Sequence, residues 1–282
     1  MDNIFTVTPM SQRISLEPGE VYTGSVTVVN PADSTSIFKY SATVAPYGVV
    51  GSDYNADFIS TGDRVQIVDW ITISEPSGEI KPGDAKEVEF QIKVPNSAPA
   101  GGQYAAIMLS SNNEADVNDG VLVQNVFEIA SLIYANVAGE TVHEGEILEN
   151  NVPGFVVTTP IVTSALLNNT GNVHEDATFV LAVSDFFTGK VILPSEENEG
   201  RYAEIIMPET ERYTTRVISD LPAVGVVKVS QTINYNGQTS VVEKNVIICP
   251  VWLIILVLLI LAALVTVVIR LVLRHYHKKH LV

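Results

Sequence analysis

Apolar and polar residues alternate along most of the chain before residue 245. The clearest case is VEFQIKV at 88–94, whose four apolar residues alternate with charged or amide residues. This period of two is typical of a half-buried β-strand. Similar segments lie at 21–29, 36–44, 104–110, 121–136, 174–184, 201–207 and 224–235. No sustained helical period interrupts them, so the pattern predicts an all-β chain up to residue 244.

Turn residues separate these segments. Pro18-Gly19 and Pro82-Gly83 each precede an alternating run, and each run ends at a proline 13 residues after the first. Proline presets φ for a turn and glycine accepts positive φ after it. The two copies are interpreted as two strands of one sandwich, since 64 residues are too few for a domain repeat here. Asn236-Gly237 between two strand-like runs predicts a two-residue hairpin.

Many short strands with such turns predict β-sandwiches, and about 244 residues suit two of them. We therefore expect two Ig-like β-sandwich domains in tandem, at 1–138 and 139–244. After them, residues 245–269 carry no charged side chain. A helix of that length would reach about 37 Å and could cross a bilayer core of about 30 Å. The pattern predicts a transmembrane helix at 245–269 and a short basic tail at 270–282.

The charge distribution predicts a topology. Four basic residues of the tail are the expected anchors at the inner headgroups: Arg270, Arg274, Lys278 and Lys279. All 32 acidic residues and the other 12 basic residues precede the helix, so residues 1–244 carry about −20. Because basic loops stay in the cytoplasm, the N-terminal domains are expected outside the cell membrane. The first residues, MDNIFTVTP, do not read as a signal peptide, which keeps a tail-anchored, cytosolic alternative open.

Little in the sequence indicates catalysis, a metal or a cofactor, and we expect no enzyme. The run His174-Glu175-Asp176 is interpreted as a solvated edge rather than a metal site, because neighbours on a strand point to opposite faces. His143 has no His or Cys neighbour at a spacing that suggests zinc. The acidic stretch 114–120 lacks the spacing of a calcium loop and is interpreted as a hairpin tip. The single cysteine, Cys249, excludes an intramolecular disulfide and is expected to be an apolar residue of the helix.

Three aromatic residues are candidate binding residues. Tyr47 and Tyr54 flank a glycine-rich turn, and Trp70 is expected on the strand face opposite Ile71 and Ile73. Exposed aromatic rings can stack on sugars or contact a protein partner. The strong negative charge disfavours nucleic acid as a partner.

Several segments together resemble the N-terminal domain of WxL-interacting proteins, surface proteins of Gram-positive bacteria. They are FTVTP, LEPGEVYTGSVTVVNPAD, YSATVAPYGVVGSDYNADF and DWITISEPSGEIKPGDAKEVEFQIKVPNSAPAGGQYAAIM. The resemblance covers about residues 4–136. It implies a peptidoglycan-binding first domain, a second Ig-like domain for partner binding, and a membrane anchor. No ligand-contact residue is carried over from it.

The expected function is therefore a membrane-anchored surface protein that tethers peptidoglycan or a WxL-type surface protein. Two alternatives remain. One is a structural spacer or adhesin module without wall affinity. The other is a tail-anchored cytosolic adaptor, because LxPGE and SGEIKPGDAKEVEF also resemble the major sperm protein domain. The oligomeric state is left open.

Overall fold

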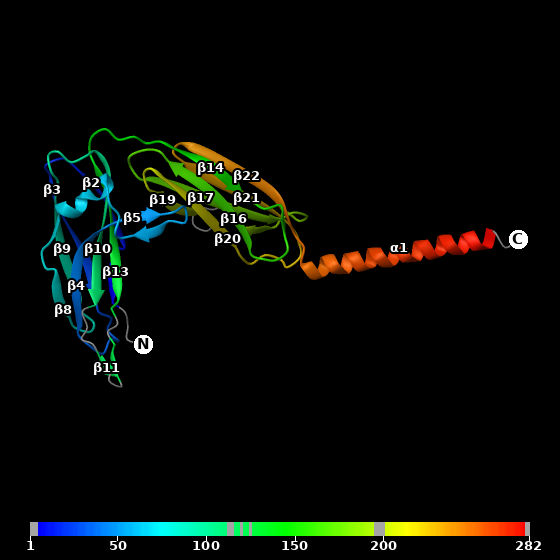
Figure 1. Cartoon of the computed structure of the whole chain (residues 1–282), viewed down its shortest axis with the longest axis horizontal. Coiled ribbons are helices and arrows are strands. Elements are labelled where there is room, and N and C mark those ends of the chain that lie inside the picture. The colour runs from blue at the N-terminus through cyan, green and yellow to red at the C-terminus, as the bar shows by residue number, and fades with distance from the viewer. Residues whose placement is uncertain (1–4, 112–115, 119–120, 124–125, 195–200, 280–282) are drawn as a thin grey trace. The chain divides into compact units, whose positions relative to one another are not determined.

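A computed structural model describes residues 5–111, 116–118, 121–123, 126–194 and 201–279. It confirms the predicted fold class: two Ig-like β-sandwich domains are followed by one C-terminal helix (Figure 1). Contacts divide the chain into two compact units. The first unit holds residues 1–146, 167–176 and 205–212; the second unit holds residues 147–166, 177–204 and 213–282.

The first sandwich has two sheets, with the order β1-β3-β9-β7 in one and β2-β13-β10-β4-β8 in the other. Short β5–β6 and β11–β12 hairpins and the 3-10 helix η1 complete it. The elements are β1 (Thr6–Thr8), β2 (Ser11–Leu16), β3 (Val21–Val29), β4 (Phe38–Pro46), β5 (Gly48–Val50), β6 (Asn55–Asp57), η1 (Asp63–Trp70), β7 (Ile71–Ile73), β8 (Ser77–Ile80), β9 (Ala85–Lys93), β10 (Gly101–Ser111), β11 (Asp116–Asn118), β12 (Val121–Val123) and β13 (Glu128–Val137).

The two Pro-Gly turns begin two strands of one sandwich, as predicted, and these strands are neighbours. β3 and β9 pair antiparallel along their whole length. Gly19 and Gly83 both adopt φ 83°, and each donates its N–H across to the end of the other strand, to Val94 O at 3.0 Å and to Asn30 O at 2.9 Å. Each turn therefore starts its own strand and closes the ladder of its neighbour. The apolar side chains of 88–94 are buried between the two sheets, as their alternation predicted.

The second sandwich also has two sheets. One has the order β14-β16-β20 and the other β15-β22-β21-β17-β18, with β19 paired to β17. The elements are β14 (Gly145–Asn151), β15 (Phe155–Val156), β16 (Ile161–Asn169), β17 (Glu175–Asp185), β18 (Val191–Leu193), β19 (Arg201–Ile206), β20 (Thr210–Ile218), β21 (Gly225–Tyr235), β22 (Gln238–Ile248) and α1 (Val251–Lys279). Asn236 and Gly237 join β21 to β22 with φ 45° and 72°, which confirms the predicted hairpin.

Three boundaries differ from the sequence predictions. The expected strand at 121–136 is two strands, β12 and β13. The expected strand face at Trp70 is the end of η1. β22 continues to Ile248, so the helix begins at Val251 rather than Asn245, and Cys249 precedes it. The helix start was predicted too early because the apolar residues at the end of β22 are followed directly by the apolar run of α1.

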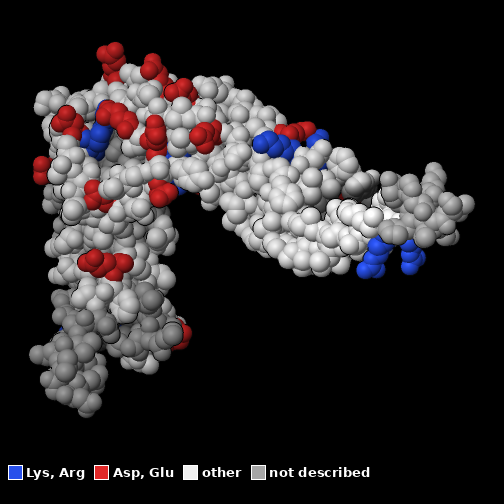
Figure 2. All heavy atoms as spheres, turned by 45° about the vertical axis from the view of Figure 1, so that its right-hand side comes forward, with Lys and Arg blue, Asp and Glu red and all other residues white. Residues whose placement is uncertain are grey.

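Among the described residues, α1 alone is long and apolar enough to cross a membrane. Residues Val251–Arg274 have a mean hydropathy of 3.3, and none of them is classed as buried. Arg270 and Arg274 lie in it and are exposed. Lys278 and Lys279 lie in the last turn of α1. In Figure 2 the helix is white, the colour of uncharged residues, with basic side chains only toward its end, whereas acidic side chains spread over the first unit.

Candidate functional site

The first unit has a second apolar cluster on the outer face of its larger sheet. β10 and β13 are apolar on both faces: one face contributes to the sandwich core and the other does not. The second cluster, here called the outer aromatic face, is formed by Tyr47, Tyr104, Ala106, Tyr134 and Met207. An apolar outer face of this kind is covered or serves as a contact surface.

Tyrosine rings pack edge to face across this surface. The ring centroids of Tyr134 lie 5.7 Å from Tyr47 and 5.9 Å from Tyr104. The Tyr134 hydroxyl donates to the Tyr47 hydroxyl at 3.2 Å, and the Tyr104 hydroxyl lies 3.3 Å from Nδ1 of His174. Burial raises the pKa of both Tyr104 and Tyr134 above the ordinary tyrosine value. These tyrosines are therefore neutral packing groups.

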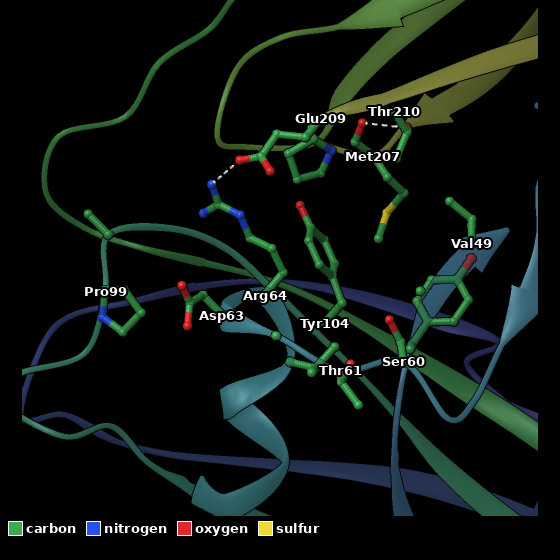
Figure 3. Close-up of a pocket in the computed structure, with 16 residues that line it drawn as sticks. Val49, Ser60, Thr61, Asp63, Arg64, Pro99, Tyr104, Met207, Glu209 and Thr210 are labelled. Atoms are coloured by element: carbon green, nitrogen blue, oxygen red, sulfur yellow. Dashed lines mark hydrogen bonds and ion pairs between the residues drawn. The ribbon is translucent and has the colours of Figure 1, made fainter. Parts of the chain in front are cut away.

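A pocket of about 540 Å³ opens beside Tyr104 (Figure 3). In the close-up the hydroxyl of Tyr104 points toward the Met207–Thr210 segment, and Arg64 reaches Glu209. The Arg64 guanidinium and the Glu209 carboxylate are 2.9 Å apart. Because this cation already has a carboxylate partner, the pocket presents no free positive charge at Arg64 for a ligand anion.

A groove of about 550 Å³ lies at the edge of β13. It is mostly apolar, and its lining residues are Met10, Ser11, Tyr47, Ala56, Phe58, Glu128, Ile129, Ala130, Leu132 and Tyr134. Met10 is 60% exposed. This edge groove runs beside a strand rather than into the protein.

The hydrogen bonds of β13 show which of its backbone groups face outward. The Ser111 N–H donates to Phe127 O at 2.8 Å, so residue 127 and every second residue after it bond to β10. The intervening residues point away from β10. Leu132 is one of these, and its N–H donates to Met10 O at 2.9 Å.

Because of the same alternation, the outward N–H and C=O groups of two residues of β13 have no backbone partner among the described residues. β2 pairs with β13 only from Leu132 onward, because the chain before Ser11 crosses to the other sheet as β1. The backbone groups of Glu128 and Ala130 point to the side that β2 does not reach, and among the described residues none forms a hydrogen bond with them. This open edge, residues 128–130, borders the edge groove.

The predicted binding aromatics lie elsewhere than expected. Trp70 and Tyr47 are each only 8% exposed; Trp70 packs in the sandwich core and Tyr47 in the outer aromatic face. Tyr54 is partly buried, accepts from Met207 N–H at 2.9 Å, and has the Arg212 guanidinium 4.4 Å from its ring centroid. The expected exposure of Trp70 is wrong, because η1 turns its side chain inward. A binding role for the three residues stays a prediction.

The polar run at 174–176 is divided among different partners. His174 packs on Tyr104 and Tyr134, Glu175 Oε1 lies 2.5 Å from His143 Nδ1, and Asp176 forms a bidentate pair with Arg13 at 2.5 and 2.7 Å. Within the described part of the chain no cluster of His, Cys, Asp and Glu could hold a metal. Of the acidic stretch at 114–120, only 116–118 is described, as β11.

Acid should destabilise the first unit through this run. Burial lowers the pKa of His174, with Arg13 adding to the effect, so the unfolded chain takes up a proton near pH 6.5 before the folded chain does. The hydrogen bonds that Arg13 donates to Asp176 lower the pKa of this carboxyl group. Protonation of Asp176 at lower pH therefore reduces the unfolding free energy further. We expect the unfolding free energy to fall from pH 7 to pH 5, measured by Trp70 fluorescence in a Trp252→Phe variant. An unchanged slope in His174→Gln would contradict this assignment.

The edge groove was missed by the sequence analysis. Met10 and Phe58 are far from β13 in sequence, and no pattern marks where β2 stops pairing. The one available signal was the sequence VLVQNVFEIASLIY at 121–134, which includes most of β13 and is apolar on both faces, as is typical of a strand that is central or covered. Its outer face is partly covered, by Tyr47, Phe58 and Met207.

Comparisons with known proteins find similar structures, but no matching family model and no matching curated sequence. No family model and no curated protein matches the chain. A structure described as a chaperone–tip adhesin complex of CFA/I fimbriae has 14% identity over 86% of this chain and 99% of that chain, with a TM-score of 0.43. The E. coli chaperone DraB has 12% identity over 86% and 96%, with a TM-score of 0.40. A PapD-like domain of human CEP192 has 13% identity over 48% and 86%, with a TM-score of 0.30.

These findings correct the expected family. The similar structures named above are fimbrial chaperones and a PapD-like domain, none of them is a WxL-interacting protein, and no family model supports that membership. The predicted membership is therefore wrong, and peptidoglycan binding and a Gram-positive source have no support. Several of these structures are described as chaperones, and their likeness to this chain concerns the fold alone.

Proposed function

We propose that this chain is a membrane-anchored protein-binding protein, and that its first unit takes up an extended segment of a protein partner as an additional strand. The observation that carries the proposal is the open edge of β13. Glu128 and Ala130 present unpaired N–H and C=O groups to the same side, next to an apolar groove. An unpaired sheet edge is a template for a further strand.

The groove supplies what the backbone edge lacks, which is a preference for particular side chains. A strand added at residues 128–130 would place alternate side chains on the side of Met10, Phe58 and Leu132. The other side chains would face solvent. The preferred partner segment is therefore extended and alternates apolar with polar residues.

The surroundings of the edge also favour a contact. Natural edge strands are commonly protected by lysine, proline or a bulge. Here Val126 and Phe127 directly precede the edge and are both exposed apolar residues. Glu128 is the charged residue that lines the groove. An apolar approach to an unpaired edge suits a partner strand.

Anchoring is part of the proposal. α1 would hold the protein in a bilayer, and the four basic residues from Arg270 to Lys279 would keep its end in the cytoplasm, with both sandwiches outside. Fimbrial or adhesin subunits are one class of partner to include in the test, because the similar structures include chaperone–adhesin complexes. Catalysis is not required for any step.

A charge in the groove tests the binding part. We expect Met10→Glu in the full chain to weaken binding of extended peptides at least tenfold, because the carboxylate would have to lose water against an apolar side chain. The probe is a displayed library of random 12-residue peptides against the protein in nanodiscs. Val21→Glu is the matched control, because Val21 is 58% exposed on β3 of the other sheet.

The enriched sequences provide a second readout. Alternation of apolar and polar residues, lost with Met10→Glu and kept with Val21→Glu, would support strand addition. Enriched peptides without a period of two, or equal binding to both variants, would rule out the edge groove as the site. A spacer without a protein ligand would enrich nothing above an unrelated Ig-like domain.

A further inference from the structure

The second unit ends in three loops beside the start of α1, here called the membrane-proximal end. β22 finishes at Ile248, and the Cys249 N–H still donates to Val156 O of β15 at 3.0 Å. Only Cys249 and Pro250 separate the sheet from Val251, the first residue of α1. Whatever direction the helix takes, this end of the sheet therefore stays within about 10 Å of the first helical turn.

Exposed apolar side chains gather at this end. The three loops are 157–160, 186–190 and 219–224, and they carry Val157, Phe186, Phe187 and Val224, all exposed. Phe187 is 77% exposed, although its ring packs edge to face on Phe186 at 5.1 Å between centroids. Single exposed apolar residues are ordinary, but several at one end of a sandwich mark a contact surface.

The Phe186-Phe187 turn lies level with the end of β22, which leads into α1. The Phe186 N–H donates to Val226 O at 3.1 Å, and Val226 is paired with Ile247 of β22. β17 is separated from β22 only by β21, and neighbouring strands are about 5 Å apart. The turn therefore lies roughly 10 Å to the side of residues 247–248, and its rings extend past the end of the strand.

The turn is held in shape by one carboxylate. Asp185 accepts hydrogen bonds from the Phe187 N–H at 3.1 Å, the Thr188 N–H at 2.7 Å and the Thr188 hydroxyl at 2.7 Å. All three bonds end on Oδ1 of Asp185 at the base of the turn, and they fix the backbone of Phe187. Residues 186–190 include no acidic side chain, and Lys190 is the nearest basic residue along the chain.

We propose that the Phe186-Phe187 turn inserts into the surface of the same bilayer that α1 crosses, so that the second unit is attached to the membrane at two points. This rests on the anchoring part of the proposed function. The occupant is lipid because the chain itself brings this end to the membrane: the interfacial layer is several ångströms thick on each side of the hydrocarbon core. Apolar side chains at that depth leave water favourably.

Spin labels in the full chain test this. In a Cys249→Ser background, single labels at Phe187→Cys, Val224→Cys, Val241→Cys and Leu261→Cys are compared in nanodiscs of phosphatidylcholine and phosphatidylglycerol. Oxygen reaches labels in lipid, and a water-soluble nickel complex reaches labels in water. Val241 is the aqueous control, because it is 56% exposed and seven residues up β22 from Ile248. Leu261 lies in the middle of α1.

We expect labels 187 and 224 to show lipid-like accessibility, label 241 to stay aqueous, and label 224 to become aqueous when Phe186→Ser and Phe187→Ser are added. Label 261 in lipid with labels 187 and 224 in water would overturn the inference and leave the anchor intact. Labels 187 and 224 shielded from both reagents would indicate a protein contact and also overturn it. Label 261 in water would refute the anchor and the inference together.

Discussion

Replacing Ala130 by proline should abolish uptake of an extended partner segment while the first unit keeps its fold. Ala130 points its N–H away from β10, so proline removes an outward donor and leaves the ladder with β10 intact. Loss of the donor, and of the close approach that a neighbouring strand needs, should weaken binding by about 100-fold. Affinity of the full chain for a peptide selected on the wild-type protein is the measurement.

Ala130→Val is the matched control for this variant. Valine keeps the N–H and favours a strand, so binding should stay within a few-fold of wild type. Thermal unfolding and circular dichroism of both variants show whether the sandwich survives. A folded Ala130→Pro protein that binds the peptide as well as Ala130→Val would show that no strand is added at this edge.

Two arginines in the middle of α1 should release the protein from the membrane. Each charge at the centre of a membrane helix costs about 2.5 to 3.5 kcal/mol on insertion scales, so Leu258→Arg with Leu261→Arg should remove most of the membrane-bound fraction. The measurement is the share of full-length protein that resists carbonate extraction from membranes. Both positions are exposed in the structure, so the change leaves the sandwich cores untouched.

Leu273→Arg is the control for the charge itself. Leu273 lies beside Arg274 near the end of the apolar span, where an arginine side chain reaches the headgroups at little cost. It should stay membrane-bound. Equal retention of the double variant and of Leu273→Arg would mean that α1 is not a transmembrane anchor.

Local alternation and turn chemistry predicted much of the fold. The two Pro-Gly turns were expected to start two strands of one sandwich, and β3 and β9 are such neighbours. Asn236-Gly237 forms the predicted hairpin because both residues accept positive φ. These features depend on a few residues each, which is why one sequence is enough to find them.

The candidate site could not be predicted in the same way. Trp70 is buried because η1 replaces the expected strand, and nothing in its neighbours signals a 3-10 helix. The open edge exists because the chain crosses from one sheet to the other before Ser11. No local sequence pattern indicates where this crossing occurs. The family resemblance was wrong for a related reason: it rested on turn and strand patterns, which report a fold shared by many families.

Hydrogen exchange at the edge of β13 tests the central claim most directly. The amide protons of Glu128 and Ala130 would be followed in the full chain with and without a selected extended peptide. Strand addition predicts that at least one of these exposed amides becomes protected when the peptide binds, while the amides of β8 at the opposite edge do not change. Binding without added protection at 128–130 would contradict the account.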